Sequence, residues 1–209
     1  MNKGVLVVVS GFSGAGKGTV MKALLEKYDN YALSISATTR NPRPGEKDGE
    51  AYFFRTREEF EQMIEEDALL EYAKYVENYY GTPRAYVEQQ LENGKDVILE
   101  IEIQGAMKVK EKIPQAVLVF VTPPSMDELK NRLIGRGTET MDVIESRLKR
   151  ASEEAEGIED YDYLLINDDL DTCVKDLHHL IQSEHYRADR NKAFIADIQK
   201  DAKTFMKGE

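Results

Sequence analysis

The stretch that decides the fold is VLVVVSGFSGAGKGT, residues 5–19. Its first part is an apolar run ended by glycines, which is typical of a buried strand. The second part matches the spacing G-x-x-x-x-G-K through Gly11, Gly16 and Lys17 and precedes a segment of helical periodicity. Glycines let successive N–H groups converge, and the lysine and the helix N-terminus add positive charge. The stretch therefore predicts a strand, a phosphate-binding loop and a helix that bind the polyphosphate of a nucleotide.

The loop departs from the usual motif at one position. Gly18 stands where Ser or Thr is usual, and Thr19 follows one residue later. The alternative is a glycine-rich turn that only links a strand to a helix. We disfavour it because the flanking strand and helix are the context that a phosphate loop requires.

The composition is that of an ordinary globular chain, with 209 residues, enough for one sizeable core. The net charge of −11 repels nucleic acid and anionic membranes, so we expect neither as a partner. A nucleotide site must then gather its positive charge locally. No segment has the length of a membrane span or a signal peptide, and Cys173 is the single cysteine. These features favour a cytoplasmic location.

Strand and helix patterns alternate along the chain, which predicts a parallel sheet with right-handed crossovers. Ligands then bind beyond the carboxyl ends of the strands. Residues 34–85 are richer in short strands and turns, so we interpret them as an insertion. We expect strands at about 4–10, 32–37, 51–55, 69–76, 97–103, 116–122 and 163–166. We expect helices at about 16–28, 57–66, 82–93, directly after 103, 126–135, 141–156 and, in two pieces, from 170 onward.

A second cationic loop lies in the predicted insertion, where Arg40 and Arg43 stand three residues apart between stiffening prolines. Arginine binds phosphate in a planar, bidentate geometry. Taken alone, the loop is equally consistent with a solvated basic loop. Together with the first phosphate loop, it suggests phosphoryl transfer between two bound nucleotides.

With these residues in place, the chain resembles the guanylate kinases. Beyond the phosphate loop, the resemblance rests on segments that occur in the family's order and extend from residue 4 to about 180. Those segments are SISATTR (34–40), RPGE (43–46), GEAYFF (49–54), LEYA (70–73), NYYGT (78–82), EIEIQG (100–105), PPS (123–125), GRGTE (135–139) and NDD (167–169).

The resemblance implies a P-loop three-layer α/β fold with a parallel central sheet, an inserted GMP-binding subdomain and a mobile lid. The core would comprise about 1–33, 86–125 and 159–209, with the insertion at about 34–85 and the lid at about 126–158. The implied reaction is ATP + GMP giving ADP + GDP, by in-line transfer with no covalent intermediate. Mg²⁺ would bridge the ATP phosphates, and a homo-oligomer is compatible with the sequence.

The resemblance also assigns site residues. Lys17, Arg40, Arg136 and Arg147 would be catalytic. ATP would contact Gly11, Ser13, Gly14, Ala15, Gly16, Lys17, Gly18, Thr19, Arg132, Arg136 and Asn167. GMP would contact Ser36, Arg40, Arg43, Tyr52, Glu71, Tyr80, Thr82, Glu100 and Glu102. Guanine presents N1–H and an amine as adjacent donors, which one carboxylate such as Glu71 can accept together, whereas adenine would leave such a site unpaired.

Glu100 and Glu102 stand two apart on a predicted strand, so we expect both to face the same way. Carboxylates on a buried strand need cations or donors nearby. We assign Glu100 to the water shell of Mg²⁺ and Glu102 to the GMP side, with no direct protein ligand to the metal. The alternative is a solvated edge strand.

Several assignments have structural alternatives. The arginines of the lid could pair with Glu128, Glu139 and Glu145, as is common on exposed helices. The NDD segment could contact adenine or simply cap a helix. Tyr79 is expected to pack rather than bind, and His178, His179 and His185 are expected to be solvated rather than metal ligands.

Two other functions stay open. A kinase for AMP or a pyrimidine monophosphate would use the same loop, and guanylate-kinase-like modules of scaffolding proteins bind partners without catalysis. Such modules usually have a damaged phosphate loop, whereas Lys17 and the arginines are intact here.

Overall fold

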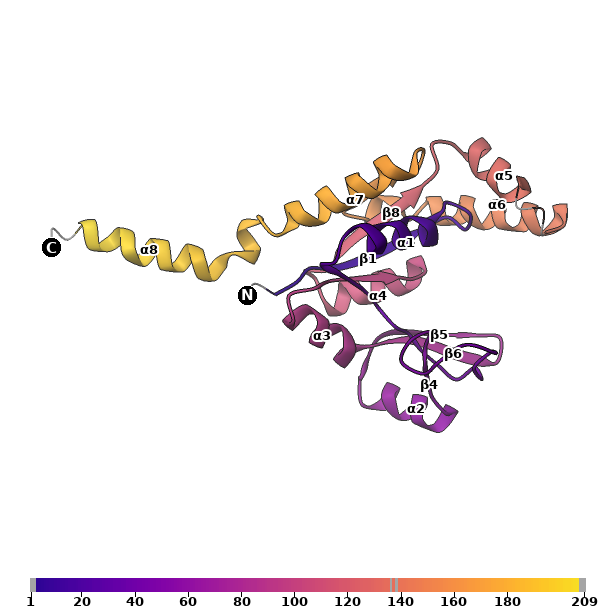
Figure 1. Cartoon of the computed structure of the whole chain (residues 1–209), viewed down its shortest axis with the longest axis horizontal. Coiled ribbons are helices and arrows are strands. Elements are labelled where there is room, and N and C mark those ends of the chain that lie inside the picture. Colours follow the sequence, from indigo (N-terminus) through magenta and orange to yellow (C-terminus); the bar gives the residue numbers. More distant parts are fainter. Residues whose placement is uncertain (1–2, 136, 138, 207–209) are drawn as a thin grey trace.

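The computed structural model describes residues 3–135, 137 and 139–206 (Figure 1). Its centre is a parallel sheet of five strands in the order β2-β7-β1-β8-β9. The parallel α/β architecture expected from the alternation of patterns is confirmed. The strands are β1 (Leu6–Gly11), β2 (Tyr31–Leu33), β7 (Asp96–Glu100), β8 (Val117–Thr122) and β9 (Tyr163–Ile166).

The apolar run of β1 lies at the middle of the sheet because it is covered on both faces. Val5, Val7 and Val9 belong to one buried cluster, and Leu6 and Val8 belong to another. Both faces of a parallel sheet are covered by crossover helices, so its strands are continuously apolar rather than alternating. The central position of β1 places the loop that follows it in the middle of the carboxyl edge.

Helices cover the two faces of this sheet. Buried residues of α1, α5, α6 and α7 join the first cluster, and those of α3 and α4 join the second. The bounds are α1 (Lys17–Lys27), α3 (Arg84–Glu92), α4 (Ile103–Lys112), α5 (Met126–Gly135), α6 (Met141–Ala155) and α7 (Leu170–Glu184), with a 3₁₀ turn at Ile158–Asp160.

A second sheet is formed by the segment between 37 and 83 and lies beside the central sheet (Figure 1). Its order is β4-β3-β6-β5, and β6 pairs antiparallel with both β3 and β5. Helix α2 begins after Thr56, whose side chain and that of Glu59 form a reciprocal capping box. The bounds are β3 (Ala37–Thr38), β4 (Phe53–Phe54), α2 (Arg57–Glu65), β5 (Leu69–Tyr75) and β6 (Asn78–Pro83).

Three predicted elements differ from the structure. The single strand expected at 32–37 is two strands, β2 and β3, in different sheets. The helix expected from 82 begins at Arg84, because 78–83 form strand β6. The strand expected at 97–103 ends at Glu100, and α4 begins at Ile103. In each case a tertiary pairing or a helix start, which the local pattern does not reveal, sets the boundary of the element.

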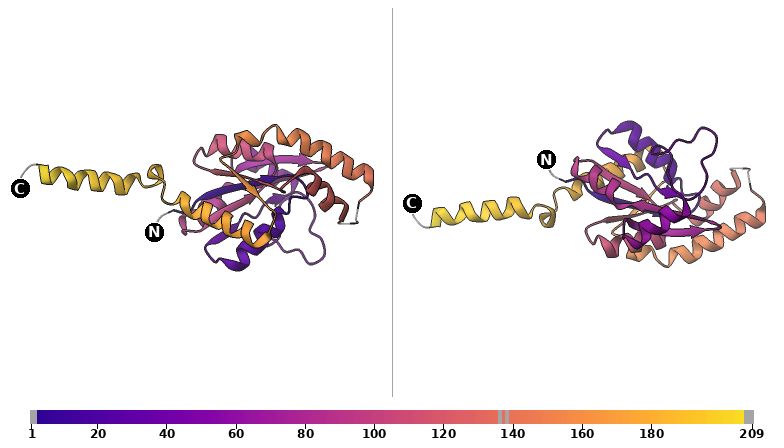
Figure 2. Two further views of the ribbon diagram at one scale, coloured as in Figure 1. Left: turned by 90° about the horizontal axis from the view of Figure 1, so that it is seen from above. Right: turned by 90° about the horizontal axis from the view of Figure 1, so that it is seen from below.

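Beyond α7, the 3₁₀ turn η2 (Ala188–Arg190) leads to α8 (Lys192–Met206), which extends away from the rest of the molecule (Figure 2). None of the helices in the described part of the chain has the length and apolar content that crossing a bilayer requires.

Two of the histidines expected to be solvated are instead packed. His178 stacks on Tyr28 with ring centres 3.7 Å apart, and its Nδ1 lies 2.7 Å from the Tyr31 hydroxyl. His185 Nε2 lies 2.8 Å from the buried carboxylate of Asp96. His179 is exposed, as expected.

Candidate active site

The loop after β1 has the backbone shape that its glycines predict. Gly16 has a φ of +91°, in the left-handed region, and a Cβ there would lie 2.5 Å from the Asn167 amide nitrogen. At Gly11 a Cβ would lie 2.1 Å from the Val121 carbonyl oxygen. Lys17 folds back so that its Nζ donates to the carbonyls of Gly11 (2.6 Å) and Phe12 (3.1 Å). The lysine and the N-terminus of α1 therefore place positive charge at one concave loop.

Asn167 supports this loop from behind. Its side chain is buried, and its Nδ2 donates to the Ala15 carbonyl at 2.8 Å. Asn167 therefore contacts the backbone of the phosphate loop, and its predicted contact with adenine stays a prediction. Its neighbour Asp169 takes the capping alternative, because its carboxylate accepts from Thr172 N and begins α7.

A cleft of about 180 Å³ lies between the carboxyl edge of the central sheet and the second sheet. Four predicted GMP residues line it, namely Ser36, Tyr52, Thr82 and Glu100. Ser34 also lines it, and its buried hydroxyl has no hydrogen-bond partner among the described residues. Sequence reasoning missed Ser34 as a site residue, although it begins the matching segment SISATTR. A hydroxyl without a partner in a cleft is a candidate ligand contact.

Glu71 and Thr82 form a buried pair beside this cleft. Thr82 Oγ1 donates to Glu71 Oε1 at 2.7 Å, and both residues are buried. Burial raises the pKa of the Glu71 carboxyl, while the Thr82 hydrogen bond and the charge of Lys108 oppose the rise. A Cβ on Gly105 would lie 3.2 Å from Glu71 Oε2, so α4 closely borders that oxygen. The pair is a fixed acceptor for donors in a partly dehydrated site.

Contacts of Arg40 and Glu46 hold the cationic loop together. The Arg40 guanidinium donates to Glu46 Oε1 at 3.0 Å and lies 5.3 Å from the centre of the Tyr52 ring. Glu46 Oε2 accepts from the backbone N–H of Arg43 at 2.7 Å. These two donors hold the pKa of Glu46 below its ordinary value, with Arg40 the larger cause. Tyr80 comes within 6.1 Å of Tyr52, centre to centre, so the predicted phosphate-binding residues converge.

Tyr79 takes the packing role expected of it. Its ring stacks on the buried Phe60 with centres 5.2 Å apart and an interplanar angle of 12°. Neighbouring residues of β6 therefore face opposite sides, as the alternation of a strand requires.

Glu100 and Glu102 do not share a strand, so the expectation that both face the same way is wrong. Glu100 ends β7, and burial raises its pKa against the opposing charge of Lys17. Glu102 is the N-cap residue of α4, and its Oε2 lies 2.7 Å from Arg150 of α6. Because the chain turns into a helix between them, only Glu100 lines the cleft.

Helix α6 brings Arg147 to the phosphate loop. Arg147 Nη1 donates to Ser13 Oγ at 3.1 Å, and Nη2 donates to Glu139. Arg132 pairs with Glu128 at 2.8 Å. Arg132 and Arg147 therefore both form the ion pairs that were the structural alternative for them. Arg147 also contacts the phosphate loop. The predicted catalytic Arg136 lies outside the described residues.

Among residues 3–135, 137 and 139–206, no group of three His, Cys, Asp or Glu side chains is placed to hold a metal ion.

Several known proteins are similar to this chain in sequence or in fold. A family model described as guanylate kinase matches residues 3–184. Guanylate kinases from Lactococcus lactis and Caldanaerobacter subterraneus are each 54% identical, over 90% and 96% of this chain and 92% and 97% of their own. The crystal structure of guanylate kinase from Anaplasma phagocytophilum has a TM-score of 0.69 at 34% identity and covers 90% of each chain. The chain therefore belongs to the guanylate kinase family.

Proposed function

We propose that this chain transfers the terminal phosphoryl group of ATP to GMP and so forms ADP and GDP. ATP binds at the loop after β1, and GMP binds in the cleft beside the second sheet. The observation that carries the choice of GMP is the buried Glu71–Thr82 pair. Its carboxylate accepts the adjacent N1–H and amine donors of guanine, whereas the N1 acceptor of adenine would face it unpaired.

The reaction needs positioning and charge neutralisation more than acid–base chemistry. The GMP phosphate is already anionic, so it attacks the terminal phosphorus of ATP in line without a general base. Arg40 and Arg43 hold the acceptor phosphate, with Tyr52 and Tyr80 beside them. Lys17 and Arg147, together with Arg136, stabilise the charge of the group in transfer.

Mg²⁺ fits this site as a partner of the ATP phosphates. Glu100 is the carboxylate that faces the phosphate loop, since a Cβ on Gly18 would lie 4.0 Å from its Oε1. Such an oxygen suits the water shell of a cation that keeps most of its water, and Gly18 leaves room for that shell. When bound with ATP, the ion supplies charge neutralisation at the phosphates.

We further propose that the segments 34–85 and 126–158 move relative to the remaining core and close over both substrates. An open site would let water take the phosphoryl group in place of GMP. A cytoplasmic location follows from the substrates, which are intracellular nucleotides, and from the single buried cysteine.

The proposal is tested by turnover with ATP and a panel of GMP, AMP, CMP and UMP. We expect GMP to be preferred strongly. A preference for AMP or a pyrimidine nucleotide would remove the guanine assignment of Glu71.

The variant Lys17→Ala separates an enzyme from a binding module. It should abolish turnover and leave GMP binding, measured by calorimetry, nearly unchanged. Turnover equal to that of the unaltered chain would refute the role of the phosphate loop.

A further inference from the structure

Ser34 lines the cleft between the two sheets, and its hydroxyl is left without a partner among the described residues. The residue follows β2 directly, where the chain leaves the central sheet for the second sheet. Because its hydroxyl oxygen is buried, it has lost its bonds to water without a replacement, which destabilises the folded state. A ligand atom that accepts from Ser34 would remove this cost.

Other buried hydroxyls beside the two sheets have partners within the chain. Ser10 Oγ donates to the Ile101 carbonyl at 2.7 Å, and Thr38 Oγ1 donates to the Tyr79 carbonyl at 2.9 Å. Ser34 differs from both in lining the cleft. Because buried polar groups in native proteins are nearly always hydrogen-bonded, this exception in the cleft indicates a partner from outside the chain.

The backbone of Ser34 is fixed to the central sheet. Its N–H donates to the Ile98 carbonyl at 2.8 Å, which extends the parallel pairing of Leu33 with Ile98 by one residue. A single rotatable bond then decides where the hydroxyl points, with three staggered positions. Contact with a ligand therefore requires a turn of the side chain but no movement of the backbone.

The surroundings of Ser34 suit the nucleoside part of GMP rather than its phosphate. Leu99 and Ile101 line the cleft beside it, and apolar walls with a few polar groups are typical of sites for organic ligands. The cations expected to hold the phosphate lie on another segment, where the Arg40 guanidinium lies over the Tyr52 ring. A phosphate is bound by charged donors of that kind, whereas a neutral hydroxyl among apolar side chains suits a base.

The proposed guanine site has acceptors for the donors of the base but few donors for its acceptors. Thr82 gives its only proton to Glu71 Oε1 at 2.7 Å, and the ionised Glu71 carboxylate can only accept. Guanine also carries two acceptors, O6 and N7, on the edge next to its N1–H group. Ser36 has one proton to give, so a second hydroxyl donor completes this edge.

We propose that Ser34 donates a hydrogen bond to the O6–N7 edge of guanine and is a further substrate-binding residue of this site. The inference rests on the proposed function, because it takes GMP as the ligand of the cleft. Binding supplies the hydrogen bond and also removes the cost of the unpaired hydroxyl in the empty protein. Ser34 therefore destabilises the empty protein and stabilises the complex.

The variant Ser34→Ala should act in opposite directions on these two states. Removal of the unpaired hydroxyl should raise the Tm of the empty chain by about 2–4 °C. The same change should raise the Kd for guanosine, measured by calorimetry, by about 3- to 10-fold, as for one neutral hydrogen bond. Either an unchanged Kd or a Tm that fails to rise overturns the proposal, because a hydroxyl that only bonds a buried water would give both.

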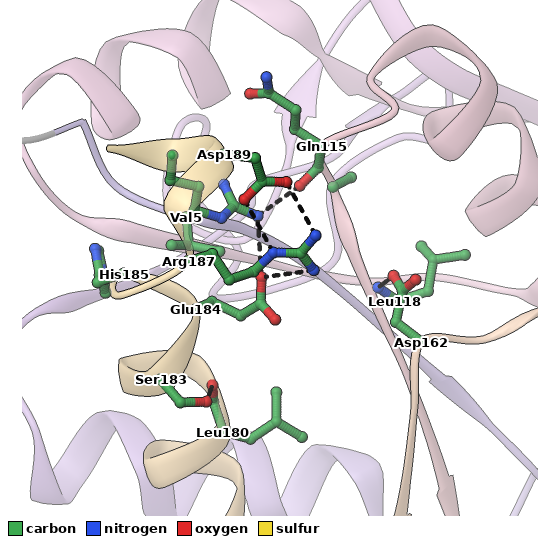
Figure 3. Close-up of polar contacts among 12 residues, drawn as sticks. Val5, Gln115, Leu118, Asp162, Leu180, Ser183, Glu184, His185, Arg187 and Asp189 are labelled. Atoms are coloured by element: carbon green, nitrogen blue, oxygen red, sulfur yellow. Dashed lines mark hydrogen bonds and ion pairs between the residues drawn. The ribbon is translucent and has the colours of Figure 1, made fainter. Parts of the chain in front are cut away.

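The matched control is Ser183→Ala, which removes the same atoms outside the cleft. Ser183 is exposed on α7, and its hydroxyl donates to the Leu180 carbonyl at 2.7 Å (Figure 3). The Kd of this variant for guanosine should equal that of the unaltered chain. A rise like that expected for Ser34→Ala would show that the loss of any serine hydroxyl weakens binding, and the proposal would fall.

Binding of 2′-deoxyguanosine identifies the part of the ligand that Ser34 contacts. Its base is that of guanosine, so Ser34→Ala should weaken its binding by the same factor. Equal binding of 2′-deoxyguanosine by the two proteins would make the ribose the partner and overturn the assignment to the base. Turnover with GMP tests the proposed function separately. If the unaltered chain phosphorylates GMP but Ser34→Ala binds guanosine equally well, the kinase proposal stands and only this inference fails.

Discussion

Glu71 determines the choice of base in this account, because its carboxylate is buried and holds one hydrogen bond from Thr82. Glu71→Gln replaces one acceptor oxygen with an amide NH₂ group. Because this group is a donor, it cannot accept a hydrogen bond from guanine. We expect KM for GMP to rise about 10- to 100-fold, as for a lost charged hydrogen bond. The preference for GMP over AMP should fall by a similar factor in steady-state kinetics.

The matched control is Glu77→Gln, an exposed carboxylate at the turn between β5 and β6. It should leave both quantities unchanged. An unaltered GMP preference in Glu71→Gln would contradict the role of this pair.

The same residue predicts a dependence on pH. The ionised carboxylate accepts the guanine donors, and burial raises the pKa of Glu71 above its ordinary value. Affinity is therefore present above that raised pKa and is lost as the pH falls through it, earlier than for an ordinary glutamate. Calorimetry with guanosine, which has no phosphate to titrate, measures this loss. The loss should be absent in Glu71→Gln, and matching profiles for the two proteins would contradict the assignment.

Arg147 of α6 reaches the phosphate loop through Ser13. Removing a group that stabilises transition-state charge costs a factor of about 100 or more in kcat. We expect this loss in Arg147→Ala with a small change in KM for ATP. Lys149→Ala removes an exposed cation two residues away on α6 and should keep the full rate. Equal rates in the two variants would show that Arg147 only pairs with Glu139.

At the scale of elements, the conformation of the phosphate loop depends on glycines that adopt left-handed backbone angles. Gly16→Ala puts a Cβ at a left-handed φ and within 2.5 Å of Asn167. The conformation alone costs about 1–2 kcal/mol, which lowers Tm by about 2–8 °C for a chain of this size. We expect that loss in a thermal scan, together with weaker ATP binding.

Gly18→Ala is the control, because its Cβ would first meet Glu100 Oε1 at 4.0 Å. It should keep or raise the Tm of the unaltered chain, because alanine favours a helix more than glycine does. A Gly16→Ala variant as stable as Gly18→Ala would contradict the description of the loop.

Element prediction from sequence succeeded where one pattern ran through a whole element. The strand β1, the helix that begins at Lys17 and the strand at 163–166 were all predicted to within two residues at each end. It failed at 97–103, where the start of α4 ends the strand early, and at 78–83, where pairing with β3 and β5 forms strand β6. The periodicity of apolar residues indicates which side chains are buried. It does not indicate which strands pair with each other.

At the scale of the whole molecule, the sequence pattern predicted the parallel sheet. It did not predict which residues of the two sheets line a common cleft. Ser36, Tyr52 and Thr82 are far apart in sequence and line one cleft with Glu100. That convergence was inferred only from the family resemblance. The orphan hydroxyl of Ser34 and the direction of α8 carry no sequence signal, because each depends on the packed surroundings.

The central claim is that one phosphoryl group passes from ATP to GMP between two sites of one chain. The direct test incubates the chain with GMP and ATP labelled in the terminal phosphate, then separates the products. We expect the label in GDP, with one ADP formed for each GDP. Label found only in inorganic phosphate, or GDP that remains unlabelled, would contradict the account.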